Sequence, residues 1–351
     1  MSDIVHHFTR AAFLTVAGLA ATIVAAAAQQ APASPAPSWV IPDLLPAARA
    51  EGGVTIYSSV NEEEGLPLWK NFEQATGIPV SYVRASDSQL SARIAIEGRA
   101  QQRSWDLFVS TAVSKLPPAL LQRYDPPQAP NLIAQARDPN HYWYGSSANY
   151  NTPAYNTKLV KAADLPTSYE GLLTHPEWKG RIAVEGTDSQ WLSAIFTYYG
   201  EDRARKLITD IVKILDPVVV DGHLALARSV GAGEYAIALN NYENLTFNAA
   251  LSGAPTDVFA VDPVALFLIQ VGISAQAPHP KTALLAANFL LSREAQQFAT
   301  AAGRIPVRGD VTPNPPDAIS KLGDHKIVAT LFTPADEKKW QGIFDGLFRP
   351  K

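Results

Sequence analysis

Residues 233–243 read Gly-Glu-Tyr-Ala-Ile-Ala-Leu-Asn-Asn-Tyr-Glu. The apolar run over 235–239 predicts a short strand, and the polar residues 240–243 that follow it predict a turn into a loop. In open α/β sheets, ligands bind where the carboxyl ends of strands open into polar loops. The stretch therefore predicts an α/β fold with a binding site at the end of this strand.

Before this stretch, short apolar strands alternate with amphipathic helical segments from residue 51 onward, which predicts a largely parallel sheet. Three strands are expected at 54–57, 78–83 and 107–109. The polar loops that follow them contain Ser59, Asn61, Arg84, Ser86 and Thr111. Because the carboxyl ends of parallel strands share one edge, we expect these loops to form one side of a cleft.

A second set of strands is expected at 182–184, 218–220 and 235–239, with Thr187 and Asp188 directly after the first of them. Between the two sets, an extended segment rich in Asn, Ser and Tyr contains Tyr150. We interpret this segment as a crossover between two Rossmann-like lobes that enclose a ligand cleft. The predicted first lobe is 51–146 plus 262–310, and the second is 147–261 plus 311–351, with crossovers near 147–156 and 258–263.

The N-terminus resembles an export signal. Residues 11–28 are apolar and rich in alanine, and Ala26-Ala27-Ala28 offers the small residues of a cleavage site. We expect a cleavable signal peptide over 1–28 and a periplasmic protein; an uncleaved membrane anchor is the alternative, since the apolar run is close to spanning length. Residues 29–50, rich in Pro and Ala, are predicted to be a spacer.

Composition excludes several function classes. The net charge is −4 in 351 residues, which argues against a basic nucleic-acid-binding surface, and the absence of cysteine excludes disulfides and thiolate zinc sites. The sequence contains no nucleophile elbow, zinc-protease motif or phosphate-binding P-loop. We therefore expect a protein that is not an enzyme, with no catalytic residues and no cofactor.

Several segments carry a family resemblance in a fixed order along the chain: 54–59, 72–78, 143–145, 155–157, 175–182, 240–243, 277–280 and 291–296. Together they resemble the ferric-iron type of periplasmic solute-binding protein, the type II two-lobe capture subunit of ABC importers. The resemblance implies a monomer that captures a small solute by hinge closure and delivers it to an ABC permease. A sensory protein that docks to a receptor is the alternative from another class.

In the iron-binding members of this family, metal ligands commonly come from a histidine in the first loop, a glutamate after the third strand in some members, and two adjacent tyrosines. The matching positions here hold Asn61, Thr111, and Tyr242 followed by Glu243. This departure favours a polar or anionic organic solute over ferric iron or a ferric chelate. Tyr242 and Glu243 are predicted metal ligands only if the cargo is ferric, in which case Tyr150 adds a phenolate.

For each remaining candidate, the residue type suggests a role in ligand binding, and a purely structural role is the alternative. Ser59 and Asn61 precede a helix whose N-terminus attracts anions, or they simply cap it. Arg84 with Ser86 forms a second anion-binding corner, or lies free on the surface. The predicted ligand-binding residues are Ser59, Asn61, Arg84, Ser86, Thr111, Tyr150, Thr187, Asp188, Asn241, Tyr242 and Glu243.

Overall fold

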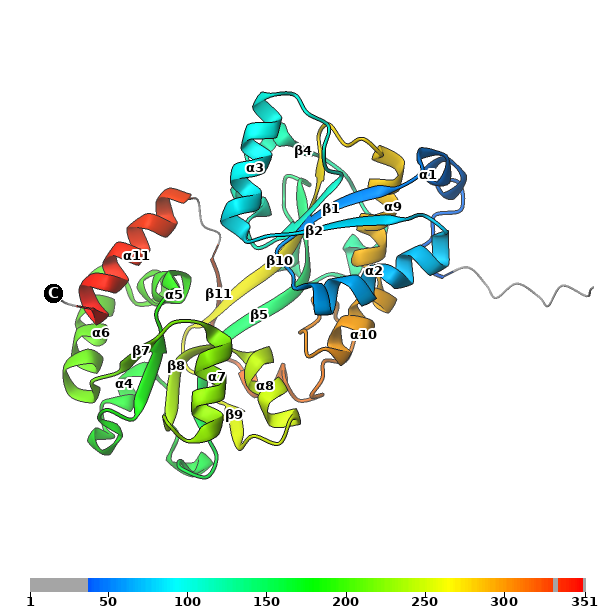
Figure 1. Ribbon diagram of the computed structural model, residues 1–351. Helices are drawn as coiled ribbons and strands as arrows, with labels where there is room; N and C mark the ends of the chain where they lie inside the picture. The colour runs from blue at the N-terminus through cyan, green and yellow to red at the C-terminus, as the bar shows by residue number, and fades with distance from the viewer. Residues whose placement is uncertain (1–36, 331–333, 350–351) are drawn as a thin grey trace, which may run out of the picture. The chain divides into compact units, whose positions relative to one another are not determined.

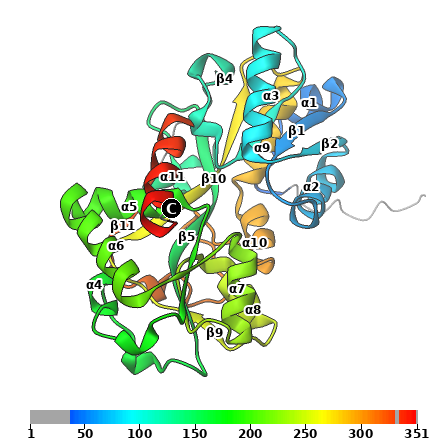
Figure 2. The same ribbon diagram turned by 60° about the vertical axis from the view of Figure 1, so that its left-hand side comes forward.

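The computed structural model describes residues 37–330 and 334–349, a mixed α/β structure built on one large sheet (Figures 1 and 2). The strands are β1 (Val54–Ser58), β2 (Val80–Arg84), β3 (Leu107–Ser110), β4 (Leu121–Gln122), β5 (Trp143–Asn156), β6 (Ile182–Glu185), β7 (Val218–Val220), β8 (Ile237–Tyr242), β9 (Thr256–Val258), β10 (Val264–Ser274) and β11 (Ile327–Ala329). The helices are α1 (Leu45–Glu51), α2 (Glu62–Thr76), α3 (Asp87–Arg99), α4 (Tyr169–Leu172), α5 (Ser189–Tyr199), α6 (Glu201–Leu215), α7 (His223–Ala232), α8 (Glu243–Leu251), α9 (Pro280–Leu290), α10 (Arg293–Ala301) and α11 (Pro334–Phe348).

The sheet has two halves joined by two long strands. Its order is β2-β1-β3-β10-β5-β8-β6-β7, with β4 and β11 paired to β10 and β9 paired to β5. Strands β1, β2 and β3 are parallel, as are β6, β7 and β8. We call the part around β1–β3 the first lobe and the part around β6–β8 the second lobe; β5 and β10 run antiparallel between them.

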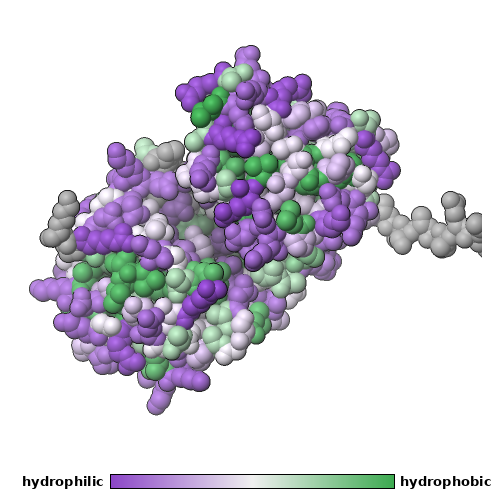
Figure 3. All heavy atoms as spheres, in the orientation of Figure 1, coloured by the Kyte–Doolittle hydropathy of each residue, from purple (hydrophilic) through white to green (hydrophobic). Residues whose placement is uncertain are grey.

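This topology places the predicted loops at common edges. In the first lobe Ser58, the last residue of β1, is in register with Arg84 at the end of β2. In the second lobe Glu185, the last residue of β6, is in register with Val220 at the end of β7. Figure 3 shows a hollow in the surface between the part that carries α3 and the part that carries α7. The carboxyl ends of both sets of strands supply the loops discussed below.

Each lobe has its own apolar core. Phe72, Ile56 and Phe108 belong to the core of the first lobe, whereas Trp191, Ile208 and Phe344 belong to that of the second. Helix α11, from the C-terminal end of the chain, packs against α5 and α6 (Figure 1). The exact residue boundaries given above for the two lobes stay a prediction.

Part of the predicted spacer is packed rather than extended. Trp39 is only 2% exposed and its ring contacts those of Phe72 and Phe289. The Asn288 amide donates to the Trp39 carbonyl oxygen (2.6 Å), and Glu51 at the end of α1 accepts from the backbone N–H of Thr282 (2.8 Å). The spacer prediction therefore does not hold for residues 37–50, because one large aromatic side chain anchors the segment in the core.

The predicted signal peptide and residues 29–36 lie outside the described residues. Within 37–330 and 334–349, no helix has both the length and the apolar character needed to cross a bilayer.

Candidate functional site

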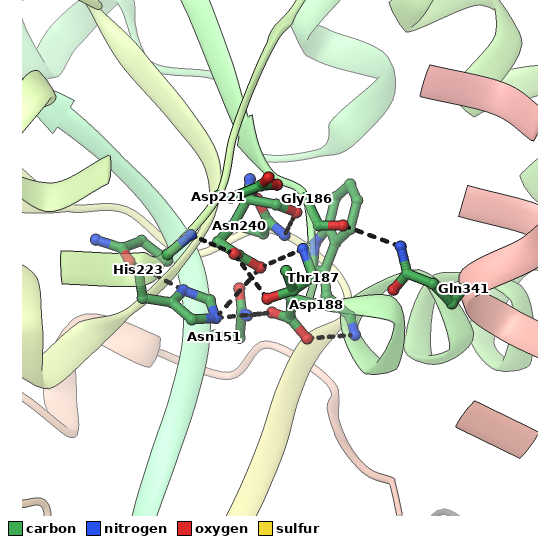
Figure 4. A network of polar contacts seen from close by, with 12 residues as sticks. Asn151, Gly186, Thr187, Asp188, Asp221, His223, Asn240 and Gln341 are labelled. Atoms are coloured by element: carbon green, nitrogen blue, oxygen red, sulfur yellow. Dashed lines mark hydrogen bonds and ion pairs between the residues drawn. The ribbon is translucent and has the colours of Figure 1, made fainter. Parts of the chain in front are cut away.

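Four polar side chains meet at the edge of the second lobe. Glu185 ends β6, Asp188 caps α5, His223 begins α7, and Tyr242 ends β8. We call these four residues the second-lobe corner; Figure 4 labels Asp188 and His223 among them, with their polar contacts. They come together because β6, β7 and β8 are parallel neighbours, so that the loops after these strands share one edge.

Glu185 organises the loops of this corner. Its side chain is fully buried and accepts hydrogen bonds from the Thr187 backbone N–H and hydroxyl (2.8 Å each) and from the Gly222 N–H (2.7 Å). On the other side, the Glu185 N–H donates to the Asn240 amide oxygen (2.7 Å). The predicted site residue Thr187 therefore bonds to Glu185 in this structure.

The pKa of the Asp188 carboxyl group lies far from its usual value. Burial, with the nearby Glu185 carboxylate as a second cause, raises the pKa of Asp188 to about 7. Its oxygens accept from the Trp191 N–H (3.2 Å) and from the Asn151 side-chain amide, and one lies 3.6 Å from His223 Nε2. Asp188 thus caps a helix and also holds a carboxyl group that changes charge near neutral pH.

Tyr242 is held in place by aromatic contacts. The His223 ring stacks on it, with 3.7 Å between centroids, and Phe267 meets it edge-on at 5.8 Å. His223 Nδ1 is in turn hydrogen-bonded to Asn241 Oδ1 (3.1 Å), so Asn241 positions the histidine. Burial lowers the pKa of His223, although the Glu185 carboxylate opposes this.

The side chains of Tyr242 and Glu243 have different neighbours. Neither carboxyl oxygen of Glu243 has a hydrogen-bond partner among the described residues, and the side chain is fully buried. Burial raises the pKa of Glu243 to about 8, Lys321 lowers it, and Asp317 and Asp257 raise it further.

Tyr150 belongs with Glu243. Burial and the Glu243 charge raise the pKa of Tyr150 to about 12. Successive strand residues point to opposite faces, and Asn151, the next residue along β5, points to Asp188. Tyr150 and Glu243 therefore lie away from the second-lobe corner, and the residues predicted as a metal-binding set do not converge.

The first-lobe candidates lie on the facing edge. The Ser59 N–H donates to the Val109 carbonyl oxygen (3.0 Å), and Arg84 Nη2 donates to Asn61 Oδ1 (3.1 Å). Asn61 precedes α2 without capping it through its side chain. Ser86 does cap α3, in a reciprocal capping box with Gln89.

Asp87 connects the two sides. Its carboxylate accepts from the Thr111 hydroxyl (2.7 Å) and from the Ser110 hydroxyl, which gives the predicted residue Thr111 a positioning role. Burial raises the pKa of Tyr242 well above its usual value, with Asp188, Glu185 and Asp87 adding to the rise and Arg304 opposing it. Charges from both lobes therefore influence Tyr242. In the absence of a compensating cation, its hydroxyl stays protonated.

The sequence pattern does not single out four residues of the site: Glu185, His223, Asn151 and Asp87. The pairing of β6 with β7 would have pointed to Glu185 and His223. Val220 lies beside Glu185 in this pairing, and His223 follows Val220 by three residues. Among residues 37–330 and 334–349, no group of three or more His, Cys, Asp or Glu side chains is arranged to hold a metal ion.

Comparison with known proteins gives the family. The model of the bacterial extracellular solute-binding protein family matches residues 102–324, more than half of the chain. The "Fe(3+)-binding periplasmic protein" of Serratia marcescens is 32% identical over 162 residues, 44% of this chain and 47% of that protein. The "Putative 2-aminoethylphosphonate-binding periplasmic protein" of Salmonella typhimurium is 27% identical over 307 residues, 80% of this chain and 83% of that protein.

Solved structures confirm the predicted fold. Iron-bound HitA from Pseudomonas aeruginosa superimposes with a TM-score of 0.68 at 23% identity, covering 85% of this chain and 98% of HitA. AfuA from Actinobacillus pleuropneumoniae, with fructose-6-phosphate bound, gives 0.66 at 20% identity, covering 86% and 99%. The architecture is that of type II periplasmic binding proteins, and with the family match this chain belongs to the bacterial extracellular solute-binding proteins.

Proposed function

We propose that this protein captures a small zwitterionic organic solute between its two lobes. The observation that carries the proposal is the distribution of charge at the two facing edges. The charges of Asp188, Glu185 and Asp87 all raise the pKa of Tyr242. A positive charge, Arg84, lies at the end of β2, only three residues from Asp87. A ligand with one cationic and one anionic end complements this arrangement.

The second-lobe corner suits an ammonium group. A carboxyl group with a pKa of about 7 becomes ionised when a cation approaches, because the opposite charge favours the ionised form. Glu185 is fully buried and accepts three hydrogen bonds from the loops, whereas Asp188 and Asp87 accept two each and keep lone pairs for a further donor. Asp188 and Asp87 are thus the groups we expect to accept hydrogen bonds from the ammonium, with the Tyr242 hydroxyl beside them.

The first-lobe edge suits an anionic group. Arg84 is exposed, and its guanidinium is well shaped to bind a carboxylate, phosphate or phosphonate through two parallel hydrogen bonds. The N-termini of α2 and α3, helices of 15 and 13 residues, open at the same edge and favour negative charge. The Salmonella relative is named for 2-aminoethylphosphonate, which carries both charges.

Delivery of the solute follows from the family. We propose export by the predicted signal peptide to the periplasm, where the relatives reside by name, and transfer to an ABC permease. Capture is by closure of the lobes about β5 and β10, as a monomer, and needs no cofactor and no bond-making step. The lobe boundaries near 147–156 and 258–263 are proposed as the hinge.

The test is calorimetry of the purified protein with 2-aminoethylphosphonate, with ethylphosphonate as the probe that lacks the amine. We expect the amine-bearing probe to bind at least about tenfold tighter, and Asp188→Asn to remove that preference. Equal affinities of the wild-type protein for both probes would contradict the proposal.

Ferric iron is the second candidate. Tyr242, Asp188 and Asp87 offer hard oxygen atoms, which ferric iron prefers, and both aspartates raise the pKa of Tyr242. The Serratia relative is named for Fe(3+). Titration with ferric citrate tests this. A visible absorption band from tyrosinate bound to iron, lost in Tyr242→Phe, would show that the cargo is iron and not an organic solute.

A further inference from the structure

We propose that an apolar pocket of the first lobe binds an apolar group, the size of an isobutyl chain, of the captured solute. The inference rests on the proposed function, which it extends from the charges of the solute to its carbon skeleton. The pocket is distinct from the second-lobe corner and lies between α2, α10 and the sheet.

The pocket is lined mainly by carbon. We call it the first-lobe pocket. Its apolar walls come from α2 (Leu68, Trp69), from the strands (Val109, Ile269) and from α9 and α10 (Leu290, Phe298, Ala299); its polar lining includes Ser58, Ser146, Ser147, Gln296, Glu64 and Arg304. A surface of this kind prefers an apolar group to water.

The size of the pocket limits the guest. Its cavity volume is ≈ 60 Å³. Since a cavity needs about 10–15 Å³ to accept one water-sized particle, the pocket accepts about four to six heavy atoms. A four-carbon branched chain fits this space, whereas a large ring system does not.

A close contact between α2 and β2 shapes one wall. A Cβ atom at Gly65 would overlap the Tyr82 hydroxyl, so only glycine allows the helix to approach this ring. The Tyr82 hydroxyl donates to the Val60 carbonyl oxygen (2.7 Å), which fixes the ring against the loop after β1. The wall is therefore held by packing and by a hydrogen bond.

One polar group of the lining has an unused donor. Gln296 is 2% exposed; its Oε1 accepts from the Val307 N–H (2.9 Å), but its Nε2 has no partner among the described residues. An unpaired buried N–H costs free energy that an acceptor on a guest would recover. The pocket thus accepts an apolar chain that ends near, or carries, one acceptor oxygen.

Arg304 joins the pocket to the binding site. It lines the pocket, donates to Glu64 (2.7 Å) and to Asn149 (3.2 Å), and acts electrostatically on Tyr242. Ser58, another lining residue, is the last residue of β1, at the edge that faces the second lobe. A solute held at that edge therefore lies beside residues that also line the pocket, and we propose that its apolar part enters there.

The test compares leucine, whose side chain is an isobutyl group, with glycine, which carries the same two charged groups and lacks that chain. Calorimetry should show leucine binding at least about tenfold tighter than glycine to the wild-type protein. Ala299→Leu fills the pocket and should reduce this preference to less than about twofold. Ala301→Leu is the matched control, because Ala301 is exposed on the same helix and does not line the pocket.

Two results overturn the inference: leucine binding no tighter than glycine, or equal loss of preference in the Ala299→Leu and Ala301→Leu proteins. Thermal unfolding confirms that each variant is folded, and Ala302→Leu, at another lining position, replaces Ala299→Leu if that variant is not. Retained, Asp188-dependent binding of 2-aminoethylphosphonate alongside either result would reject the pocket and leave the proposed function standing.

Discussion

The imidazole ring of His223 lies face to face with the phenol ring of Tyr242, with 3.7 Å between centroids and 18° between planes. The same imidazole is hydrogen-bonded to Asn241, the residue before the tyrosine. His223 thereby fixes the ring of Tyr242 from a different element, α7, and sets the position of the hydroxyl at the end of β8.

His223→Ala should weaken solute binding by about tenfold without unfolding the protein. The variant removes an aromatic contact of roughly 0.5–1.5 kcal/mol and a hydrogen bond of roughly 1 kcal/mol that hold Tyr242 in its binding position. Calorimetry with 2-aminoethylphosphonate measures the effect.

His175→Ala provides the matched control. His175 stacks on Trp178 at 4.1 Å and 10°, a similar ring contact located away from the site. An equal loss of affinity in both variants would show that the His223 stack has no specific role in binding.

Asp188 should couple solute binding to proton release. Its folded pKa of about 7 lies above the usual 3.8, so the free protein holds a proton there below pH 7. An ammonium group that requires the ionised form must displace this proton, and affinity should rise by up to about fivefold from pH 6 to pH 7.

The comparison is with Asp188→Asn, which keeps a good helix cap and cannot titrate. Calorimetry at both pH values in both proteins separates the contribution of Asp188 from titration of the solute itself. Identical pH dependence in the two proteins would remove Asp188 from the binding mechanism.

Glu243 should make the protein less stable as the pH rises. Its folded pKa is raised from 4.5 to about 8, so between these values the folded state binds a proton that the unfolded state lacks. Stability from this group is therefore greatest at low pH and is lost as the pH increases through that window, at a rate of at most ~1.4 kcal/mol per pH unit.

Glu243→Gln removes this dependence. We expect the free energy of unfolding of the variant, relative to wild type, to increase by on the order of 1–3 kcal/mol between pH 5 and pH 8. Urea denaturation at the two pH values measures it. A constant difference between the two proteins would mean that Glu243 is ionised in the folded state throughout.

Gly65→Ala should destabilise the first lobe. The added methyl group overlaps the Tyr82 hydroxyl, and overpacking of this kind costs about 1–3 kcal/mol, more than the helix propensity gained. Gly342→Ala, in α11 with no atom within 4 Å of the added Cβ, should instead stabilise by about 0.5–1 kcal/mol. Thermal unfolding of the two variants should give shifts of opposite sign; shifts of the same sign are the contrary outcome.

Local signals in the sequence predicted most of the fold. The strand expected at 54–57 is β1 (Val54–Ser58), and the serine expected to cap the next helix, Ser86, does so. The packing of Trp39 was not predictable, because its partners Phe72 and Phe289 are remote in the chain and the surrounding prolines indicated an extended segment.

The site was predicted less completely, since its chemistry depends on pairs from separate elements. The sequence pattern marks Tyr242 and Asp188, which follow predicted strands, whereas no local pattern marks His223, which joins them only through the pairing of β6 with β7 and β8. Conversely, Tyr242 and Glu243 are adjacent in sequence and were treated as a possible pair, yet their side chains have different neighbours. A residue at a strand-to-helix junction does not reveal from sequence alone which way its side chain points.

Native mass spectrometry of the protein purified from the organism that encodes it tests the central claim most directly. The account predicts an added mass that corresponds to a small zwitterionic organic solute that contains nitrogen, present in the wild-type protein and lost in Asp188→Asn. An added mass of iron, or an organic solute that Asp188→Asn retains in full, would contradict it.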